Sequence, residues 1–409
     1  MSSVDTGSFL VITVVAAAAA LTVALLPRRL GPPVVVLELL LGIAVGPHGL
    51  GLARVDDFIA FFSNLGLSLL FFFAGYEIDF TRIRGRPLQL GAWGWFVSVA
   101  IAYAIGAVLV ADGIVLSFVF AGSALATTAI GTLIPILRDA GELRTGFGRY
   151  LLAAGAVGEF GPILLITLVL STQNPLREAG IFVAFVAVAL TVAMLSMRWA
   201  WRGWPLMERT LESSSQLAVR LVAVLVLGLT ALAAELGLDI LVGGFAAGMI
   251  MRLALRGHEL DVLESKLTAL GFGFLVPFFF VTSGMRFDLD ALVSSAGALL
   301  KLPLFLGLLL VARGIPALLL YRRVLDARDR VALAFFSATA LPLVVGITTI
   351  ATAEGHMRSS TAAALVGAAI LSTLAFPFVG LALRRPGGVR TAIAGSADAG
   401  EASLPAPSS

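Results

Sequence analysis

The sequence has no cysteine, only three histidines and few charged residues, which make up 13% of its 409 residues. Without cysteine the chain forms no disulfide and offers no thiol nucleophile or thiolate metal ligand. His48, His258 and His356 fall in expected loops, so a histidine-rich metal site is not expected. A soluble domain carries about a quarter charged residues. The low charge therefore excludes a soluble enzyme, and also a disordered protein.

The chain is rich in apolar residues: 59% of it is hydrophobic, and its mean hydropathy is +1.01. A membrane-spanning helix needs about 20 mostly apolar residues. The apolar runs between clusters of charge predict an all-α polytopic membrane protein with thirteen transmembrane helices, over residues 8–26, 33–47, 58–76, 88–110, 114–137, 148–171, 179–198, 217–236, 239–255, 267–285, 292–320, 331–353 and 360–383.

The basic residues predict how these helices are oriented. The loops after odd-numbered spans hold 21 of the 28 lysines and arginines, and the loops after even-numbered spans hold 4. Because positively charged loops stay in the cytoplasm, the N-terminus is expected outside the cell and the C-terminus in the cytoplasm. The expected location is the cell (inner) membrane. We expect one membrane transport domain over 1–383 and a short disordered cytoplasmic tail over 384–409. The small net charge of +3 gives no reason to expect a nucleic-acid partner.

Segments of the first half reappear in the second half. The glycines of LGIAVG, Gly42 and Gly46, match Gly244 and Gly248 of GGFAAG, and Gly75 matches Gly284 in two phenylalanine-rich helix ends. SALATTAIG likewise matches FSATALPLVVG. Helices 2–6 thus repeat as helices 9–13, over about 32–171 and 239–383, in opposite orientations. Inverted repeats are typical of transporters whose binding site lies near the midplane.

Two segments at equivalent repeat positions should not be regular helices. Residues 124–136 hold Thr127, Thr128 and Pro135, and residues 337–346 hold Thr339 and Pro342. Proline removes an amide donor and clashes with the preceding turn. Broken helices are tolerated at membrane depth only inside protein or beside a wet cavity. The freed carbonyls and the threonine hydroxyls could then bind ions, although each segment could also be a simple kink.

Glu159 lies near the middle of the helix over 148–171, next to Gly158. An ionised carboxylate there is costly unless it is paired or hydrated. Burial favours the protonated form, so such a carboxyl can exchange a proton for a cation. The alternative is a purely structural hydrogen bond to a neighbouring helix.

Other charged residues within the spans are candidate supporting residues. Glu38 could line an ion path or extend to the membrane surface. Lys301 could partner a buried acid or compete with the transported cation, whereas Arg313 is better explained by snorkelling. Glu77, near the end of its helix, is expected to pair with nearby Arg82 or Arg84 in solvent.

Several stretches together resemble the monovalent cation:proton antiporters, in the branch with the Kef-type and NapA-type proteins. They are PPVVVLELLLGIAVGPHGLGL, LGLSLLFFFAGYEIDF, SALATTAIGTLIPILRDAGEL and GRYLLAAGAVGEFGPILLI. The resemblance implies crossed broken helices, a dimerisation domain and alternating access by an elevator-like motion. It places the ion-binding acid at Glu159, the threonines of one break at Thr127 and Thr128, and the opposing break near Thr339 and Pro342.

The chain departs from the family pattern at the ion site. Family members usually carry aspartate there, preceded by Asp, Asn or Gln, whereas this chain has Gly158 and Glu159. The lysine that electrogenic members carry aligns with Leu304 rather than with Lys301. A single carboxylate that exchanges one proton for one cation would be electroneutral. No cofactor is expected, and neither is the large regulatory domain that often follows this fold.

These observations predict a transporter rather than an enzyme: a homodimer that exchanges Na⁺ or K⁺ for H⁺ across the lipid bilayer, with the monovalent cation bound at Glu159. One alternative is a sodium-coupled symporter of an organic anion on the same fold, which would need more polar and basic groups near the midplane. Another is a cation channel or sensor, for which a continuous polar stripe along a helix would be expected.

Overall fold

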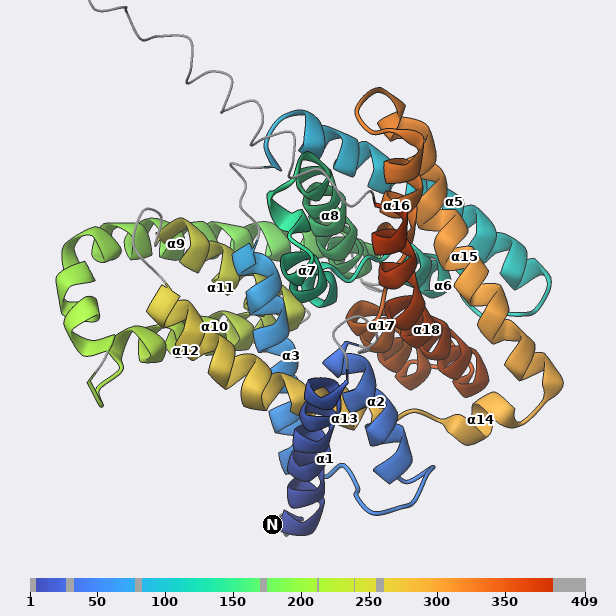
Figure 1. The fold of residues 1–409 in the computed structure, drawn as a ribbon, viewed down its shortest axis with the longest axis horizontal. Helices are drawn as coiled ribbons and strands as arrows, with labels where there is room; N and C mark the ends of the chain where they lie inside the picture. Colours follow the sequence, from blue (N-terminus) through green and yellow to red (C-terminus); the bar gives the residue numbers. More distant parts are fainter. Residues whose placement is uncertain are drawn as a thin grey trace, which may run out of the picture.

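The computed structural model of the chain describes residues 5–26, 33–77, 83–169, 175–211, 213–238, 240–254 and 261–384 (Figure 1). These residues form helices joined by short turns, with no strand among them. The helices pack as two bundles, whose members follow one another along the chain in the order first, second, first, second.

The first bundle contains the helices whose contacts centre on α3 and α11 (Figure 1). Its members are α1 (Thr6–Leu25), α2 (Val34–Val45), α3 (Asp57–Glu77), α9 (Pro175–Leu211), α10 (Leu217–Glu235), α11 (Ile240–Ala254), α12 (Asp261–Leu270), the π-helical turn η2 (Gly271–Leu275) and α13 (Val276–Met285).

Helices of the second bundle contact one side of α15, and both interrupted helices belong to this bundle. Its members are α5 (Arg86–Ala111), α6 (Phe118–Leu125), α7 (Ile130–Asp139), the 3₁₀ turn η1 (Glu142–Arg144), α8 (Gly146–Val169), α15 (Ala296–Leu320), the 3₁₀ turn η3 (Tyr321–Arg323), α16 (Ala327–Ser337), α17 (Pro342–Ala353) and α18 (Ser359–Leu383). The short helix α14 (Leu289–Val293) leads from the first bundle to the second and packs against α18.

Each of the thirteen predicted spans coincides with one helix or with consecutive helical segments of the chain. Within the described residues, nine helices are long and apolar enough to cross a membrane, and three shorter apolar segments accompany them. The least buried of the nine lie at the outside of the molecule, where their apolar side chains face lipid. The chain is therefore a polytopic membrane protein. The predicted tail from residue 385 onward lies outside the described residues.

The first bundle is held together by direct approach of helix backbones. Gly42 of α2 faces the main chain of α13 at Val281, and Gly248 of α11 faces the main chain of α3 at Phe72. A Cβ atom at either glycine would overlap a carbonyl oxygen. Only glycine therefore permits α2 to pack on α13 and α11 to pack on α3 at this separation.

The same contacts recur with the partners exchanged: Gly284 of α13 meets the main chain of α2, and Gly75 of α3 meets that of α11. Gly46 and Gly244 make main-chain contacts of the same kind, Gly46 with Met285 of α13 and Gly244 with Ser68 of α3. The match of Gly42 and Gly46 with Gly244 and Gly248 stays a prediction.

Replacing Gly248 by alanine should destabilise the protein by about 1–3 kcal/mol, the usual cost of overpacking, because the added methyl meets backbone rather than a flexible side chain. The matched control is Gly228→Ala in α10, where no heavy atom lies within 4 Å of the new Cβ. There alanine should be neutral or stabilising by up to about 1 kcal/mol. Thermal unfolding in detergent compares the two, and equal melting temperatures would contradict the packing described.

Candidate functional site

Two interrupted helices cross inside the second bundle. The first break, Ala126–Ala129, separates α6 from α7, and the second, Ala338–Leu341, separates α16 from α17. The breaks touch through their main chains, since the Ala129 amide donates to the Thr339 carbonyl at 2.7 Å. Each interruption is therefore stabilised by hydrogen bonds to the other break, in place of those missing within each helix.

The breaks lie within the segments predicted from the sequence, but neither proline lies in a break: Pro342 follows its break directly, and Pro135 lies further downstream. Pro342 is the first residue of α17, where its missing amide costs nothing. Pro135 lies inside α7, downstream of its break. The first break instead begins where the Thr127 hydroxyl donates to the Ala124 carbonyl at 2.9 Å and satisfies the end of α6.

The three predicted threonines are fully buried at the crossing. The Thr128 hydroxyl donates to the Ser337 carbonyl at 2.5 Å, and the Thr339 hydroxyl donates to the Phe335 carbonyl at 3.2 Å. The Thr128 amide donates to the Gly158 carbonyl at 3.0 Å, which connects the first break to α8. Each hydroxyl that donates to a carbonyl keeps oxygen lone pairs free to accept or to ligate.

Glu159 is 2% exposed and lies beside the first break. Its Oε1 atom is 3.8 Å from the position that a Cβ atom on Gly131 would take, in the first turn of α7, and its Oε2 atom has no hydrogen-bond partner among the described residues. A helix N-terminus carries a partial positive charge and free amides, both of which favour an anion. The carboxyl thus has one oxygen near the end of a half-helix and one free for a proton or a cation.

The residue after Glu159 marks the boundary between the bundles. Phe160 of α8 stacks on Phe245 of α11, with ring centroids 4.8 Å apart and planes inclined by 15°. Leu70 and Ala74 of α3 lie against Gly131 from the first bundle. The carboxyl is therefore inside protein, close to where one bundle meets the other.

Arg313 is 4% exposed and joins the elements at the crossing. Its guanidinium donates to Thr128 Oγ1 at 2.9 Å and to Ser98 Oγ at 3.1 Å. It also donates to the carbonyls of Ser337 at 3.3 Å and Ala154 at 3.2 Å. Snorkelling is therefore the wrong interpretation of Arg313, since its head group lies in the bundle interior and ties α15 to α5, α8 and both broken helices.

Gly158 explains how this arginine fits. A Cβ atom at Gly158 would overlap the Arg313 guanidinium and the Thr128 hydroxyl. The absence of a side chain at Gly158, which the sequence shows as a departure from the family pattern, therefore gives the guanidinium its place. Sequence reasoning missed Ser98 and the Ala154 carbonyl as partners, because neither a serine in a long helix nor a carbonyl has a pattern of its own.

Lys301 and Glu38 lie apart from these contacts. Lys301 is half-buried, and its ammonium donates to Thr361 Oγ1 at 2.9 Å, near Arg358. It therefore does not partner Glu159. Glu38 is 3% exposed on α2, so it does not extend to the membrane surface.

The two ends of the boundary between the bundles differ. At one end Arg138 of α7 pairs with Glu77 of α3 and lies 3.7 Å from Glu264 of α12. Of the partners predicted for Glu77, Arg82 lies outside the described residues, and the fold also brings Arg138 across from the other bundle to pair with Glu77. These ion pairs hold the bundles together at this end.

At the other end a cavity of about 550 Å³ opens between the bundles. Ser63 and Ser283 line it from the first bundle, and Thr348, Thr349 and Ser359 line it from the second. Its lining, among the described residues, includes neither Glu159 nor either break. The molecule is thus open on one side of the site and closed by ion pairs on the other.

An all-α membrane protein in which two half-helix pairs cross beside a buried carboxyl has the architecture of a secondary transporter. Residues 15–381 match the family model described as sodium/hydrogen exchanger, transmembrane, and the chain belongs to this family. The family resemblance predicted from the motifs is thereby confirmed.

Individual relatives agree with this assignment. The chain is 26% identical to the putative Na⁺/H⁺ antiporter YjbQ of Bacillus subtilis, over 92% of this chain and 63% of that protein. It is 28% identical to the Na⁺/H⁺-K⁺ antiporter GerN of Bacillus cereus, over 64% of this chain and 68% of the relative. It thus spans less than two thirds of the Bacillus subtilis protein. The sodium proton antiporter MjNhaP1 of Methanocaldococcus jannaschii shares its fold, with a TM-score of 0.61, 17% identity, and coverage of 92% and 95% of the two chains.

The contact of Gly158 with Arg313 predicts a non-additive pair of substitutions. Gly158→Ala should lower the melting temperature, because its methyl displaces the Arg313 guanidinium and leaves the buried acceptors of that guanidinium without their hydrogen bonds. In an Arg313→Gln background the same alanine should cost much less, since most of the overlap is gone. The coupling between the two is expected to be about 0.5–3 kcal/mol.

Gly346→Ala is the control for this pair, because Gly346 also lies in a broken helix but has no heavy atom within 4 Å of its added Cβ. Its cost should be the same in both backgrounds. Additive effects of Gly158→Ala and Arg313→Gln, measured by thermal unfolding, would contradict the contact.

Proposed function

We propose that the protein exchanges a monovalent cation, Na⁺ or K⁺, for protons across the cell membrane, and that Glu159 binds both. The observation that carries the proposal is the placement of a buried carboxyl, with one oxygen unpartnered, beside two crossed helix breaks. The names of the relatives support the cation and the proton as the transported pair. Thr127, Thr128, Thr339 and carbonyls of the two breaks are the proposed additional oxygen ligands, since hard monovalent cations prefer oxygen.

Exchange follows from the cost of burying an ionised carboxylate. Moving the bare anion across a low-dielectric barrier is unfavourable, whereas a bound proton or cation neutralises it. The carboxyl therefore crosses the barrier with a bound proton or a bound cation, but not as the bare anion. A site that carries a cation in one direction must then carry a proton back, which is exchange. Gly158, Arg313 and Pro342 support the site by shaping and fixing the crossing, and Glu38 is kept as a candidate on the ion path.

Electroneutral exchange is the proposed stoichiometry. Arg313 stays within the second bundle in every state, so its charge counts equally in both directions, and Glu159 with its bound proton or monovalent cation has no net charge in either loaded form. One carboxyl that takes up either one proton or one monovalent cation moves the same charge in both directions. A dependence of the exchange rate on membrane potential would argue against this stoichiometry.

Alternating access requires the boundary between the bundles to open at each end in turn. The cavity at one end and the Arg138 ion pairs at the other end support assigning this conformation as open toward the end that holds His48. The distribution of basic residues supports assigning that end to the outside of the cell, with the N-terminus outside and the C-terminus cytoplasmic. From the family resemblance we also propose a homodimer, in which the first bundle is the dimerisation domain. Within each chain, the inverted repeats are proposed over about 32–171 and 239–383.

The alternatives have weaker support. A symporter of an organic anion would need basic groups around a midplane cavity, but Arg313 is used up by four protein acceptors. A channel would need a continuous polar path, whereas the cavity lining among the described residues stops short of Glu159.

Glu159→Gln should abolish exchange, because the amide neither gains a proton nor neutralises a cation, and Glu159→Asp should keep part of the activity. The measurement is dissipation of a pH gradient in proteoliposomes after addition of Na⁺, K⁺ or Li⁺. Glu235→Gln is the control, since it removes an exposed carboxyl of α10 away from the crossing and is expected to leave exchange measurable. Exchange by Glu159→Gln at the parental rate would exclude Glu159 as the binding group.

The assignment of the open end is testable because the chain has no cysteine of its own. A Thr349→Cys variant should react with a membrane-impermeant maleimide through the cavity, because Thr349 is an exposed residue of its lining. Adding Arg138→Gln removes ion pairs at the opposite end and should lower the labelling rate as the cavity closes more often. Arg322→Gln, an exposed arginine outside those ion pairs, should leave the rate unchanged. Labelling that is unaffected by Arg138→Gln would contradict the role of that ion pair.

A further inference from the structure

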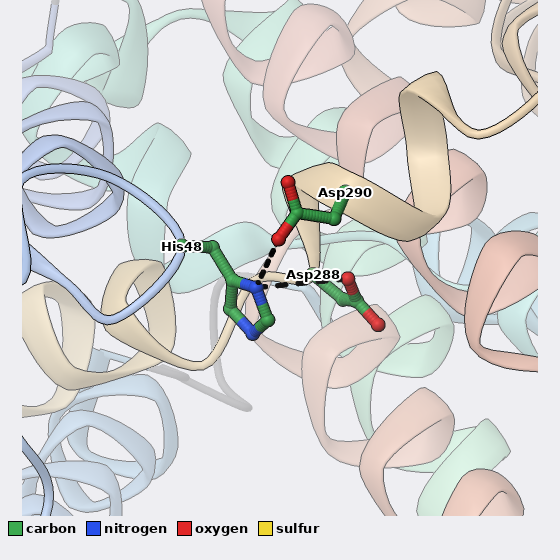
Figure 2. Close-up of side chains that lie close together, drawn as sticks. All are labelled: His48, Asp288 and Asp290. Carbon is green, nitrogen blue, oxygen red and sulfur yellow. Dashed lines mark hydrogen bonds and ion pairs between the residues drawn. The ribbon is translucent and has the colours of Figure 1, made fainter.

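Three metal-ligating side chains meet at the mouth of the cavity (Figure 2). His48 comes from the loop after α2, and Asp288 and Asp290 come from the segment in which α13 passes into α14. His48 Nδ1 is 2.9 Å from Asp290 Oδ2 and 3.9 Å from Asp288 Oδ1. The three donor atoms all lie within 4.8 Å of one another.

One imidazole nitrogen and two carboxylate oxygens form a donor set that suits Zn²⁺ and similar divalent transition metals. Ligand atoms about 2.0–2.1 Å from a tetrahedral zinc ion are about 3.3 Å apart. The two separations from His48 Nδ1 lie on either side of that value, so small side-chain rotations would bring all three atoms to a common centre. Water would take the fourth position.

The surroundings allow a cation to reach this cluster. The side chains of His48, Asp288 and Asp290 are 37%, 35% and 77% exposed. The Asp288 carboxylate also accepts the Ala291 amide at 2.8 Å, which fixes its orientation. Arg286 lines the same cavity and sets one positive charge against the two carboxylates.

The cluster also spans two parts of the molecule that belong to different bundles. The loop that carries His48 follows α2 of the first bundle, whereas α14, which carries Asp290, packs against α18 of the second. His48 and Asp288 line the cavity together with Ser359, at the start of α18. A metal bound to all three residues would therefore tie the two sides of the mouth together.

We propose that His48, Asp288 and Asp290 form a binding site for a divalent transition-metal cation, represented by Zn²⁺, that bridges the cavity mouth and slows the transport cycle. The slowing rests on the proposed exchange function, but the binding does not. The site is separate from Glu159 and takes a different class of ion.

Binding is tested directly on the purified full chain, by calorimetric titration with Zn²⁺ and by the absorption spectrum of added Co²⁺. One equivalent of metal should bind. His48→Ala or Asp290→Asn should each weaken binding by at least about tenfold, because losing a residue that only hydrogen-bonds to a metal ligand already costs that much, and losing the ligand itself should cost no less. His356→Ala is the matched control, because His356 stacks on Phe120 and belongs to no such cluster among the described residues. It should bind as the parent does.

Exchange in proteoliposomes, measured with Zn²⁺ on the cavity side, tests the consequence. Zn²⁺ should slow exchange several-fold, EDTA should restore it, and His48→Ala should be insensitive. No stoichiometric binding, or unchanged affinity in both ligand variants, overturns the site. Binding without any effect on exchange overturns the bridging role. A parent protein that binds Zn²⁺ but exchanges no cation would contradict the proposed function while confirming the site.

Discussion

The structure depends on the hydrogen bonds that connect two interrupted helices inside a membrane-embedded bundle. A break in a membrane helix exposes amides and carbonyls that lipid cannot satisfy. Here each break supplies partners for the other, from the Ala129 amide to the Thr339 carbonyl and from the Thr128 hydroxyl to the Ser337 carbonyl. The guanidinium of Arg313 adds a donor that reaches both breaks and two further helices. These bonds hold irregular backbone in place beside Glu159.

The same arrangement relates this chain to its family and distinguishes it within that family. The family resemblance implies a polar side chain ahead of the proposed ion-binding acid, and here that position is Gly158. The guanidinium of Arg313, from α15, occupies the space that a side chain at position 158 would fill. A residue more than 150 positions away along the chain therefore places a charged group beside the proposed site.

The helices, their breaks and the buried acid could be predicted from sequence because each leaves a local signal: a long apolar run, a proline with threonines, or a carboxyl far from any charge cluster. Partners could not be predicted in the same way. Arg313 looked suited to reach the membrane surface because its distance along the helix is visible in sequence, but the hydroxyls and carbonyls that draw it inward are not. The pairing of Glu77 with Arg138 likewise depends on which helices become neighbours in three dimensions.

The flat contact between Phe160 and Phe245 has a consequence for movement. Within the first bundle, glycines bring helix backbones together so closely that neighbouring helices interlock and resist shear. Two nearly parallel rings, by contrast, present smooth faces that keep dispersion contact while one translates over the other. Such a pair beside the carboxyl would keep the two bundles in contact during the proposed movement of one bundle past the other.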